Sequence, residues 1–185
     1  MAASGVRVSG GAHRGRRLEV PASARPTSGR LREALLSIWG EELPGSRFLD
    51  LFAGSGVMGL EAAGRGALSV LAVEGNPRAL KVLERNRSSL GEAIDLRRLK
   101  LPEGLERLLQ EEAGPFDLIF ADPPYAYTAH EKLLTAVSPL LARHGEFALE
   151  HSSRHPAPDQ AADLIRVDTR RYGESCLSRY RHGPS

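Results

Sequence analysis

The most constraining feature of the sequence is an alternation of short apolar runs with amphipathic segments between residues 47 and 150. Apolar runs of roughly 4–8 residues suit buried strands, and longer amphipathic segments suit the helices that cover them. Strands that alternate with helices form mostly parallel sheets with helices on both faces, as in Rossmann-like α/β folds. The pattern predicts strands at 47–51, 69–74, 93–97, 116–121 and 145–150, and helices at 57–65, 77–90, 102–112 and 129–141.

The start of the chain does not follow this alternation. Residues 6–8 and 18–20 are alternating apolar segments that flank a stretch rich in glycine and arginine, which predicts a β-hairpin. We therefore expect two parts: a basic hairpin extension at 1–26 and a catalytic domain at 27–185.

A helix is predicted next, and two strands are predicted at the end of the chain. Thr27 is a suitable N-cap and Gly40 a suitable stop. Residues 163–171 and 175–181 alternate well enough to form an antiparallel pair at the sheet edge, which brings the expected sheet to seven strands. The predicted apolar face of the helix consists of Leu31, Leu35, Ile38 and Trp39.

Charge is segregated along the chain although the formal total is only +2. Residues 1–32 contain seven arginines and one acid, residues 166–185 contain five arginines and two acids, and the middle is acidic. Arginines interleaved with turn glycines and valines are typical of a folded surface that faces phosphates, so we expect a nucleic-acid partner. The predicted RNA contacts are Arg7, Arg14, Arg16, Arg17, Arg25 and Arg30.

The composition argues against several other classes of protein, namely membrane, secreted, disulfide-bonded and zinc-binding proteins. The chain of 185 residues is the size of one ordinary domain, and it lacks both a membrane-length apolar run and a signal-peptide core. We therefore expect a cytoplasmic protein, acting as a monomer. The single cysteine, Cys176, cannot form an internal disulfide and makes a poor zinc site, so no metal is expected.

A strand, a glycine turn and a helix are predicted around residues 48–59. Gly54, Gly56 and Gly59 have the spacing that lets a ligand approach backbone amides at a helix N-terminus. Glu74 follows the next strand, where a carboxylate accepts hydrogen bonds from ribose hydroxyls. Together these residues predict an adenosine-containing cofactor.

Asp50 distinguishes between two adenosine-containing cofactors, a nicotinamide dinucleotide and S-adenosylmethionine. A carboxylate just before the glycine turn would repel a pyrophosphate, but it suits the ammonium group of S-adenosylmethionine. The run from Asp50 to Gly56 resembles the first motif of class I methyltransferases, and Glu74 resembles their ribose-binding acid. Residues 99–102 depart from the family, because many members have an acid or amide there. The predicted cofactor-binding residues are Asp50, Phe52, Ala53, Gly54, Ser55, Gly56, Gly59 and Glu74.

The second constellation is Asp122-Pro123-Pro124-Tyr125, at the end of the predicted strand 116–121. An exocyclic amino group on a base is a weak nucleophile because its lone pair is delocalised into the ring. The Asp122 carboxylate and the Pro123 carbonyl could each accept one N–H and leave the lone pair free. The two prolines stiffen the loop, and Tyr125 offers a face for base stacking.

This tetrapeptide resembles the fourth motif of amino-methyltransferases that act on adenine N6, cytosine N4, guanine N2 or glutamine. The arginine-rich start, the glycine turn and Asp122-Pro123-Pro124-Tyr125 occur in the order of the bacterial ribosomal small-subunit methyltransferase D family, which the chain resembles over nearly its whole length. That resemblance implies methylation of guanine N2 in 16S ribosomal RNA, on naked RNA or on the small ribosomal subunit.

Three alternatives stay open at this point. An adenine-N6 methyltransferase acting on DNA or RNA would use the same chemistry at Asp122. A nicotinamide-dependent (NAD) oxidoreductase shares the fold, but Asp50 and the lack of a hydride-handling pair argue against it. The third alternative is a non-catalytic RNA-binding assembly protein, against which the intact acceptor pair and cofactor acids argue.

Overall fold

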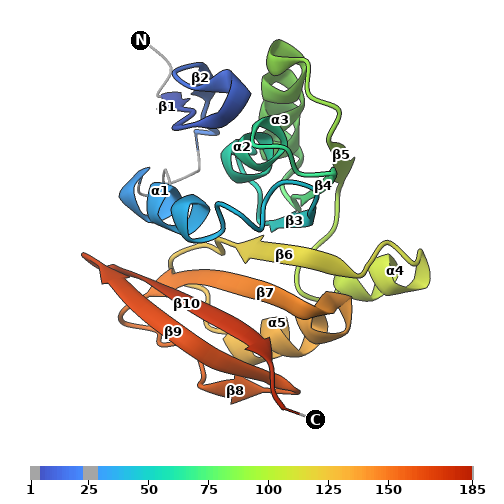
Figure 1. Cartoon of the computed structure of the whole chain (residues 1–185), viewed down its shortest axis with the longest axis vertical. Coiled ribbons are helices and arrows are strands. Elements are labelled where there is room, and N and C mark those ends of the chain that lie inside the picture. Colours follow the sequence, from blue (N-terminus) through green and yellow to red (C-terminus); the bar gives the residue numbers. More distant parts are fainter. Residues whose placement is uncertain (1–4, 23–28, 185) are drawn as a thin grey trace. The chain divides into compact units, whose positions relative to one another are not determined.

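The structure is a computed structural model that describes residues 5–22 and 29–184. The chain divides into two compact units, residues 1–98 and residues 99–185. Figure 1 labels their helices and strands. Thr27 and Arg25 lie outside the described residues.

The first unit contains a two-stranded hairpin and a three-stranded parallel sheet in the order β5-β4-β3 (Figure 1). Its elements are β1 (Gly5–Arg7), η1 (Gly11–His13), β2 (Arg17–Glu19), α1 (Gly29–Ile38), β3 (Arg47–Leu51), α2 (Val57–Gly64), β4 (Ser69–Val73), α3 (Pro77–Leu90) and β5 (Asp95–Arg97). The predicted hairpin is confirmed, since Val6 is paired with Leu18 in an antiparallel register.

The core of the first unit forms where α1 and the sheet bury apolar side chains. Trp39, just after α1, packs edge-on against Phe48 of β3, with ring centroids 5.9 Å apart. On α1 the buried apolar positions are Leu31, Leu35 and Leu36, whereas Ile38 is only half-buried. The predicted face of this helix was therefore wrong at one position, because its buried stripe runs through Leu36.

The second unit contains a five-stranded sheet in the order β6-β7-β10-β9-β8. Strand β6 is parallel to β7, and the later strands are antiparallel to their neighbours. Its elements are α4 (Leu105–Gln110), β6 (Phe116–Ala121), α5 (His130–Val137), η2 (Ser138–Leu140), β7 (Leu141–Ser152), β8 (Gln160–Ala161), β9 (Leu164–Tyr172) and β10 (Ser175–His182).

The boundaries of two predicted helices were too generous. Helix α4 begins at Leu105 because the chain turns tightly before it: a Cβ on Gly104 would lie 2.7 Å from the Lys100 carbonyl oxygen. Helix α5 ends at Val137 because Pro139 cannot continue α-helical hydrogen bonding, and the chain goes on as the 3-10 turn η2. Strand β7 starts at once, at Leu141.

The predicted α/β class is confirmed, with parallel pairing for β3, β4 and β5 and again for β6 and β7. Strands β3 to β10 number eight in the described residues, where seven were predicted. The additional strand is β8, whose two residues are too few to show an alternating pattern. Within the described ranges, no helix is both long enough and apolar enough to span a bilayer.

Candidate functional site

The glycine turn of the first unit follows β3 and leads into α2, as predicted. Gly54 and Gly56 have positive φ angles of 56° and 79°, and Phe52 has a φ of 55°, which is strained for a residue with a side chain. A Cβ on Gly56 would lie 2.8 Å from Leu83 Cγ. The Ala53 amide donates to the Val73 carbonyl at 3.1 Å, so the turn is held against the end of β4.

Asp50 is buried at the end of β3 and holds the first turn of α2. Its Oδ2 accepts the Gly59 amide N–H at 3.0 Å. A Cβ on Gly59 would lie 3.0 Å from Val70 Cγ1 and 3.3 Å from this same oxygen, so a larger residue would push α2 away. The third glycine of the spacing therefore lets the helix approach the sheet.

Glu74 is partly exposed and lies directly after β4. Its Oε2 accepts the Gly54 amide at 2.9 Å, and its Oε1 accepts the Asn76 amide at 2.8 Å. Asn76 in turn caps α3, because its Oδ1 accepts the Arg78 amide at 2.9 Å. The carboxylate that we predicted as the ribose ligand thus connects the glycine turn to the start of α3.

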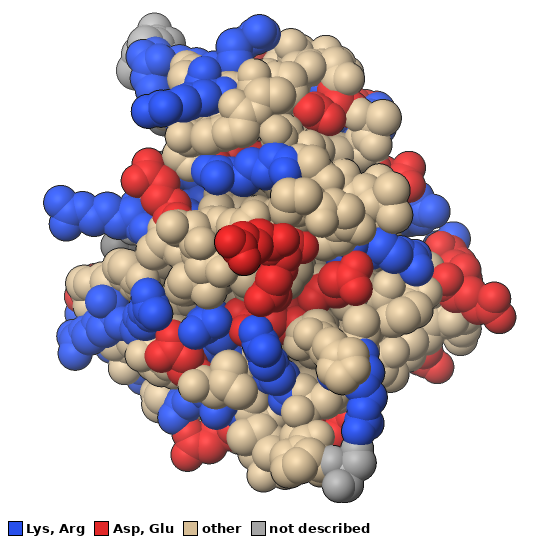
Figure 2. Space-filling view, in the orientation of Figure 1, with Lys and Arg blue, Asp and Glu red and all other residues tan. Residues whose placement is uncertain are grey.

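The hairpin of the first unit carries the predicted RNA-contacting arginines. Arg7, Arg14, Arg16 and Arg17 are exposed on it, and Arg30 is exposed on α1. Figure 2 shows basic side chains gathered over the hairpin. The Arg16 guanidinium donates to the Ser89 carbonyl on α3 at 3.1 Å, and Arg7 donates to the Gly15 carbonyl at 3.1 Å.

Glu61 fastens this hairpin to α2, a role that we did not predict. It is fully buried, and its two oxygens accept the Ser9 amide at 2.7 Å and the Ser9 hydroxyl at 2.6 Å. Arg32 pairs with it at 3.0 Å and also donates to the Arg7 carbonyl at 2.8 Å. The charge of Arg32 is therefore neutralised in the interior, although it contributes to the basic excess of the N-terminal sequence.

Close packing supports the same attachment. A Cβ on Gly11 would lie 2.6 Å from the Gly64 carbonyl oxygen, and Gly11 has a φ of 72°. His13 Nε2 lies 2.5 Å from Glu92 Oε1, which ties the loop of the hairpin to the turn after α3. The sequence held one signal for this attachment: Glu61 is the only charged residue within the otherwise apolar helix Val57–Gly64.

The predicted acceptor segment begins where β6 ends in the second unit. Asp122 and Tyr125 are partly exposed, Pro123 is buried and Pro124 is exposed. The Tyr127 amide donates to the Pro124 carbonyl at 2.8 Å and closes a turn. Burial, with a smaller contribution from Glu103, raises the pKa of Tyr127 from its ordinary value of 10 to about 12.

Two buried histidines anchor the end of this segment. The His130 ring lies 5.5 Å from the Tyr127 ring and 5.6 Å from the His151 ring. His151 Nε2 is 2.9 Å from the Ser178 hydroxyl, which joins β7 to β10. Burial and the neighbouring His151 lower the pKa of His130, and burial also lowers the pKa of His151. Both rings are therefore held neutral near pH 7.

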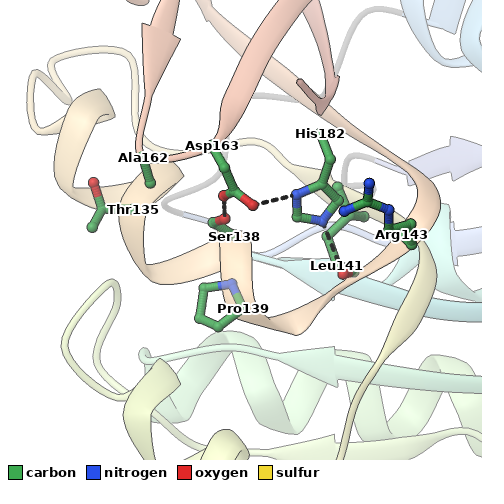
Figure 3. A pocket seen from close by; sticks show the side chains of 8 residues that line it. All are labelled: Thr135, Ser138, Pro139, Leu141, Arg143, Ala162, Asp163 and His182. Atoms are coloured by element: carbon green, nitrogen blue, oxygen red, sulfur yellow. Dashed lines mark hydrogen bonds and ion pairs between the residues drawn. The ribbon is translucent and has the colours of Figure 1, made fainter. Parts of the chain in front are cut away.

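A cavity of about 460 Å³ in the second unit is lined in part by serine, aspartate and histidine side chains. Figure 3 shows these lining side chains from close by. Asp163 accepts from the Ser138 hydroxyl and lies 2.7 Å from His182 Nδ1, while His182 Nε2 lies 3.1 Å from the Leu141 carbonyl oxygen. The Ser138 hydroxyl chiefly, and His182 in addition, lower the pKa of Asp163. Because both nitrogens of His182 face acceptors, the ring has no position to take a proton from Ser138, which argues against a nucleophilic triad.

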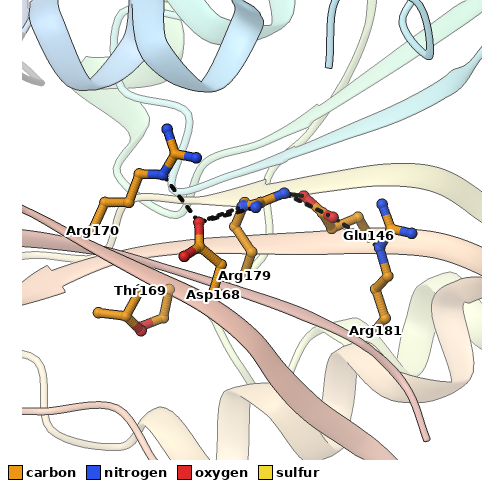
Figure 4. Close-up of polar contacts among 7 residues, drawn as sticks. Glu146, Asp168, Thr169, Arg170, Arg179 and Arg181 are labelled. Atoms are coloured by element: carbon orange, nitrogen blue, oxygen red, sulfur yellow. Dashed lines mark hydrogen bonds and ion pairs between the residues drawn. The ribbon is translucent and has the colours of Figure 1, made fainter. Parts of the chain in front are cut away.

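The C-terminal arginines are largely engaged within the sheet (Figure 4). Glu146 is fully buried and pairs with Arg179 at 3.0 Å and with Arg181 at 2.9 Å. Asp168 pairs with Arg179 at 2.9 Å and with Arg170 at 3.1 Å. Arg179 therefore holds β10 to both β7 and β9, and Arg181 holds β10 to β7.

Comparison with known proteins places these observations in a family. The family described as "Conserved hypothetical protein 95" matches residues 6–181. "Putative rRNA methyltransferase YlbH" of Bacillus subtilis is 31% identical over 182 residues, which cover 95% of this chain and 98% of that protein. "Ribosomal RNA small subunit methyltransferase D" of Escherichia coli K12 is 34% identical over 122 residues, covering 65% of this chain and 60% of that protein.

Solved structures agree with the sequence relatives. The structure of "Putative methyltransferase yhhF" from Escherichia coli has a TM-score of 0.84 at 26% identity, and the match covers 98% of this chain and all of that one. The predicted Rossmann-like methyltransferase fold is thereby confirmed.

Proposed function

Because the chain belongs to the Conserved hypothetical protein 95 family of class I methyltransferases, we propose that it methylates N2 of a guanine in 16S ribosomal RNA. S-adenosylmethionine is its cofactor and, when bound, supplies an electrophilic methyl group on a sulfonium. The observation that carries the proposal is the co-occurrence of a glycine turn closed by Glu74, an Asp-Pro-Pro-Tyr segment and an arginine-bearing hairpin in one chain of this family.

We propose that the cofactor binds on the glycine turn of the first unit. The turn fits such a ligand, because a Cβ on Gly54 would meet nothing closer than the Phe52 carbonyl oxygen at 3.9 Å, which leaves the backbone open to approach. Each Glu74 oxygen accepts one amide and retains a second lone pair for a ribose hydroxyl. The proposed ligand residues are Asp50, Phe52, Ala53, Gly54, Ser55, Gly56, Gly59 and Glu74.

The proposed acceptor site is Asp122 with the Pro123 carbonyl. These two acceptors take the two N–H groups of the amine, so that its lone pair is directed away from the ring plane. Pro124 restricts the backbone, and Tyr125 stacks on the base, an interaction that contributes roughly 1–3 kcal/mol. The residues position the nucleophile and need no proton transfer before the methyl group is attacked.

The substrate is proposed from the relatives and from the hairpin. The relatives' names specify ribosomal RNA, in the Escherichia coli protein that of the small subunit. Exposed arginines on residues 5–22 form a surface that suits RNA phosphates, with Arg25 outside the described residues. We therefore assign RNA contact to the extension 1–26 and methyl transfer to residues 27–185, in a monomeric protein.

The decisive experiment supplies labelled S-adenosylmethionine with naked 16S RNA, with purified small subunits, or with DNA, each lacking the modification. Nucleoside mass spectrometry of the product should show N2-methylguanosine in the ribosomal substrate. Label in N6-methyladenosine instead would assign the chain to adenine methylation. Cofactor binding without label in any substrate would overturn the proposed reaction and favour an assembly role.

A further inference from the structure

Asn86, on the buried side of α3, connects the hairpin to the glycine turn. Its side chain is 3% exposed. Its Oδ1 accepts the Glu19 amide at 2.9 Å, and its Nδ2 donates to the Glu19 carbonyl at 2.9 Å and to the Ser55 carbonyl at 2.8 Å. One amide group thus binds both backbone groups of a β2 residue and a carbonyl of the turn, all within the first unit.

The two ends of this connection belong to different proposed tasks. Ser55 lies between the two glycines with positive φ, in the segment assigned to the cofactor. Glu19 ends β2, shortly after Arg16 and Arg17 of the proposed RNA surface. Because both Nδ2 hydrogens are used and the amide is buried, a shift of the Ser55 peptide group must either move the β2 edge or break a buried hydrogen bond.

Glu61 provides a second attachment, which restricts movement of the hairpin relative to α2. It fixes Ser9, at the other end of the hairpin, to α2, and α2 begins directly after Gly56. The hairpin is therefore held at Ser9 by α2, which follows the glycine turn, and at Glu19 by α3, whose Asn86 contacts the turn at Ser55. Because the hairpin is fixed at both Ser9 and Glu19, a change in the mobility of the glycine turn can change the mobility of the hairpin arginines.

We propose that Asn86 is a positioning residue that couples occupancy of the cofactor turn to the order of the hairpin, and hence to RNA affinity. The RNA part of this inference rests on the proposed function. Coupling between two ligands is reciprocal, so cofactor should tighten RNA binding by the same factor as RNA tightens cofactor binding. A purely structural asparagine would stabilise the fold without creating this dependence.

Hydrogen exchange of the full chain, with and without S-adenosylhomocysteine, tests the coupling directly. In the wild type, the cofactor product should slow exchange in peptides covering residues 5–22 about fivefold, the lower end of typical coupling. Asn86→Asp keeps the acceptor for the Glu19 amide but removes both donations. In this variant, S-adenosylhomocysteine should still slow hydrogen exchange around residues 50–60 but should no longer slow it in the hairpin. Asn86→Ala provides a second variant with the same expectation.

Arg85→Ala is the matched control. Arg85 is the neighbouring residue on α3 and also binds Glu19, but through an exposed ion pair at 2.7 Å that does not involve the glycine turn. Its removal should leave the fivefold effect intact. Unchanged hairpin slowing in Asn86→Asp, or no slowing in the wild type, would overturn the inference.

RNA binding separates this inference from the proposed function. Affinity for small-subunit RNA should rise about fivefold with S-adenosylhomocysteine in the wild type and not at all in Asn86→Asp. If RNA failed to bind while exchange in the hairpin still followed the cofactor, the proposed substrate would be wrong and the coupling through Asn86 would stand.

Discussion

Glu74 Oε2 accepts the backbone N–H of Gly54 at 2.9 Å, across 20 residues of sequence. The second oxygen of the same carboxylate accepts the Asn76 amide, so the side chain closes the glycine turn before any ligand is considered. This arrangement fixes the direction of the carboxylate. A ribose bound here would add hydrogen bonds to an acceptor that is already oriented, which lowers the entropy cost of binding.

Replacing Glu74 should weaken cofactor binding more than it weakens the fold. Two hydrogen bonds to a charged acceptor contribute roughly 1.5 kcal/mol each, so Glu74→Ala should lower S-adenosylhomocysteine affinity about 100-fold by calorimetry. Glu74→Gln retains one oxygen, so its S-adenosylhomocysteine affinity should lie between that of the wild type and that of Glu74→Ala. Glu84→Ala, at an exposed position of α3, is the control. A change below threefold in Glu74→Ala would remove Glu74 from the cofactor site.

Asp122→Ala should abolish methyl transfer and leave cofactor affinity within a few-fold of the wild type. The expectation follows because the carboxylate is proposed to hold the amine and has no assigned part in binding S-adenosylmethionine. Asp117→Ala removes an exposed carboxylate from β6, the strand that precedes Asp122, and this variant should keep its activity. Single-turnover transfer to small-subunit RNA measures both variants, and wild-type rates for Asp122→Ala would refute the role.

The parts of the fold that repeat a local pattern could be predicted from the sequence. Strand β3 and helix α3 lie where the pattern predicted them, because apolar periodicity, Asn76-Pro77 and Gly91 are local signals. The predicted start of α4 and the predicted end of α5 were wrong because the turn at Gly104 and the proline at 139 outweigh the apolar pattern there.

The interactions that assemble the hairpin could not be read from local pattern. Glu61 and Asn86 bind residues that are 52 and 67 positions away in sequence. Glu61 is conspicuous as the charged residue of an apolar helix, but nothing near it in the sequence identifies its partner, and Asn86 is an ordinary residue of its helix. Only the tertiary fold shows that Arg32 forms a buried ion pair with Glu61, whereas Arg14 is exposed on the surface. Net charge along the sequence therefore overestimated the basic surface.

Removing three hairpin arginines should weaken RNA binding in a salt-dependent way. Each arginine that no longer neutralises a phosphate should reduce the slope of log affinity against log salt by about 0.7–0.9, so Arg14, Arg16 and Arg17 replaced by Ala should reduce it by about 2–3. Cofactor affinity should not change. Arg107→Ala, an exposed arginine of α4, is the matched control. An unchanged slope in the triple variant would show that RNA binds elsewhere.

The buried histidine pair predicts a decrease in stability in mild acid. Burial lowers the pKa of His130 and of His151 below the ordinary value of 6.5, so the unfolded chain binds more protons than the folded one. The free energy of unfolding should be greatest above pH 6.5 and fall as pH drops toward the folded-state values. Each ring contributes a slope of at most about 1.4 kcal/mol per pH unit. Urea titrations between about pH 7.5 and 5 should show a shallower slope for His130→Gln, and the wild-type slope for exposed His144→Asn.

The Glu61 anchor allows stability and hairpin docking to be separated. Glu61→Ala leaves the Arg32 charge buried without its partner and should destabilise the chain by about 3–5 kcal/mol. The double variant Glu61→Leu with Arg32→Met replaces the pair by apolar groups and should recover most of that stability, because such replacements are often neutral. It still removes the acceptors for the Ser9 amide and hydroxyl, so hydrogen exchange in residues 5–22 should stay fast and RNA binding should stay weak.

Chemical denaturation and hydrogen exchange on the same samples measure stability and hairpin docking separately. A double variant that regained stability together with a protected hairpin would show that packing at Gly11 and Gly64, and not the Glu61 carboxylate, holds the hairpin on α2.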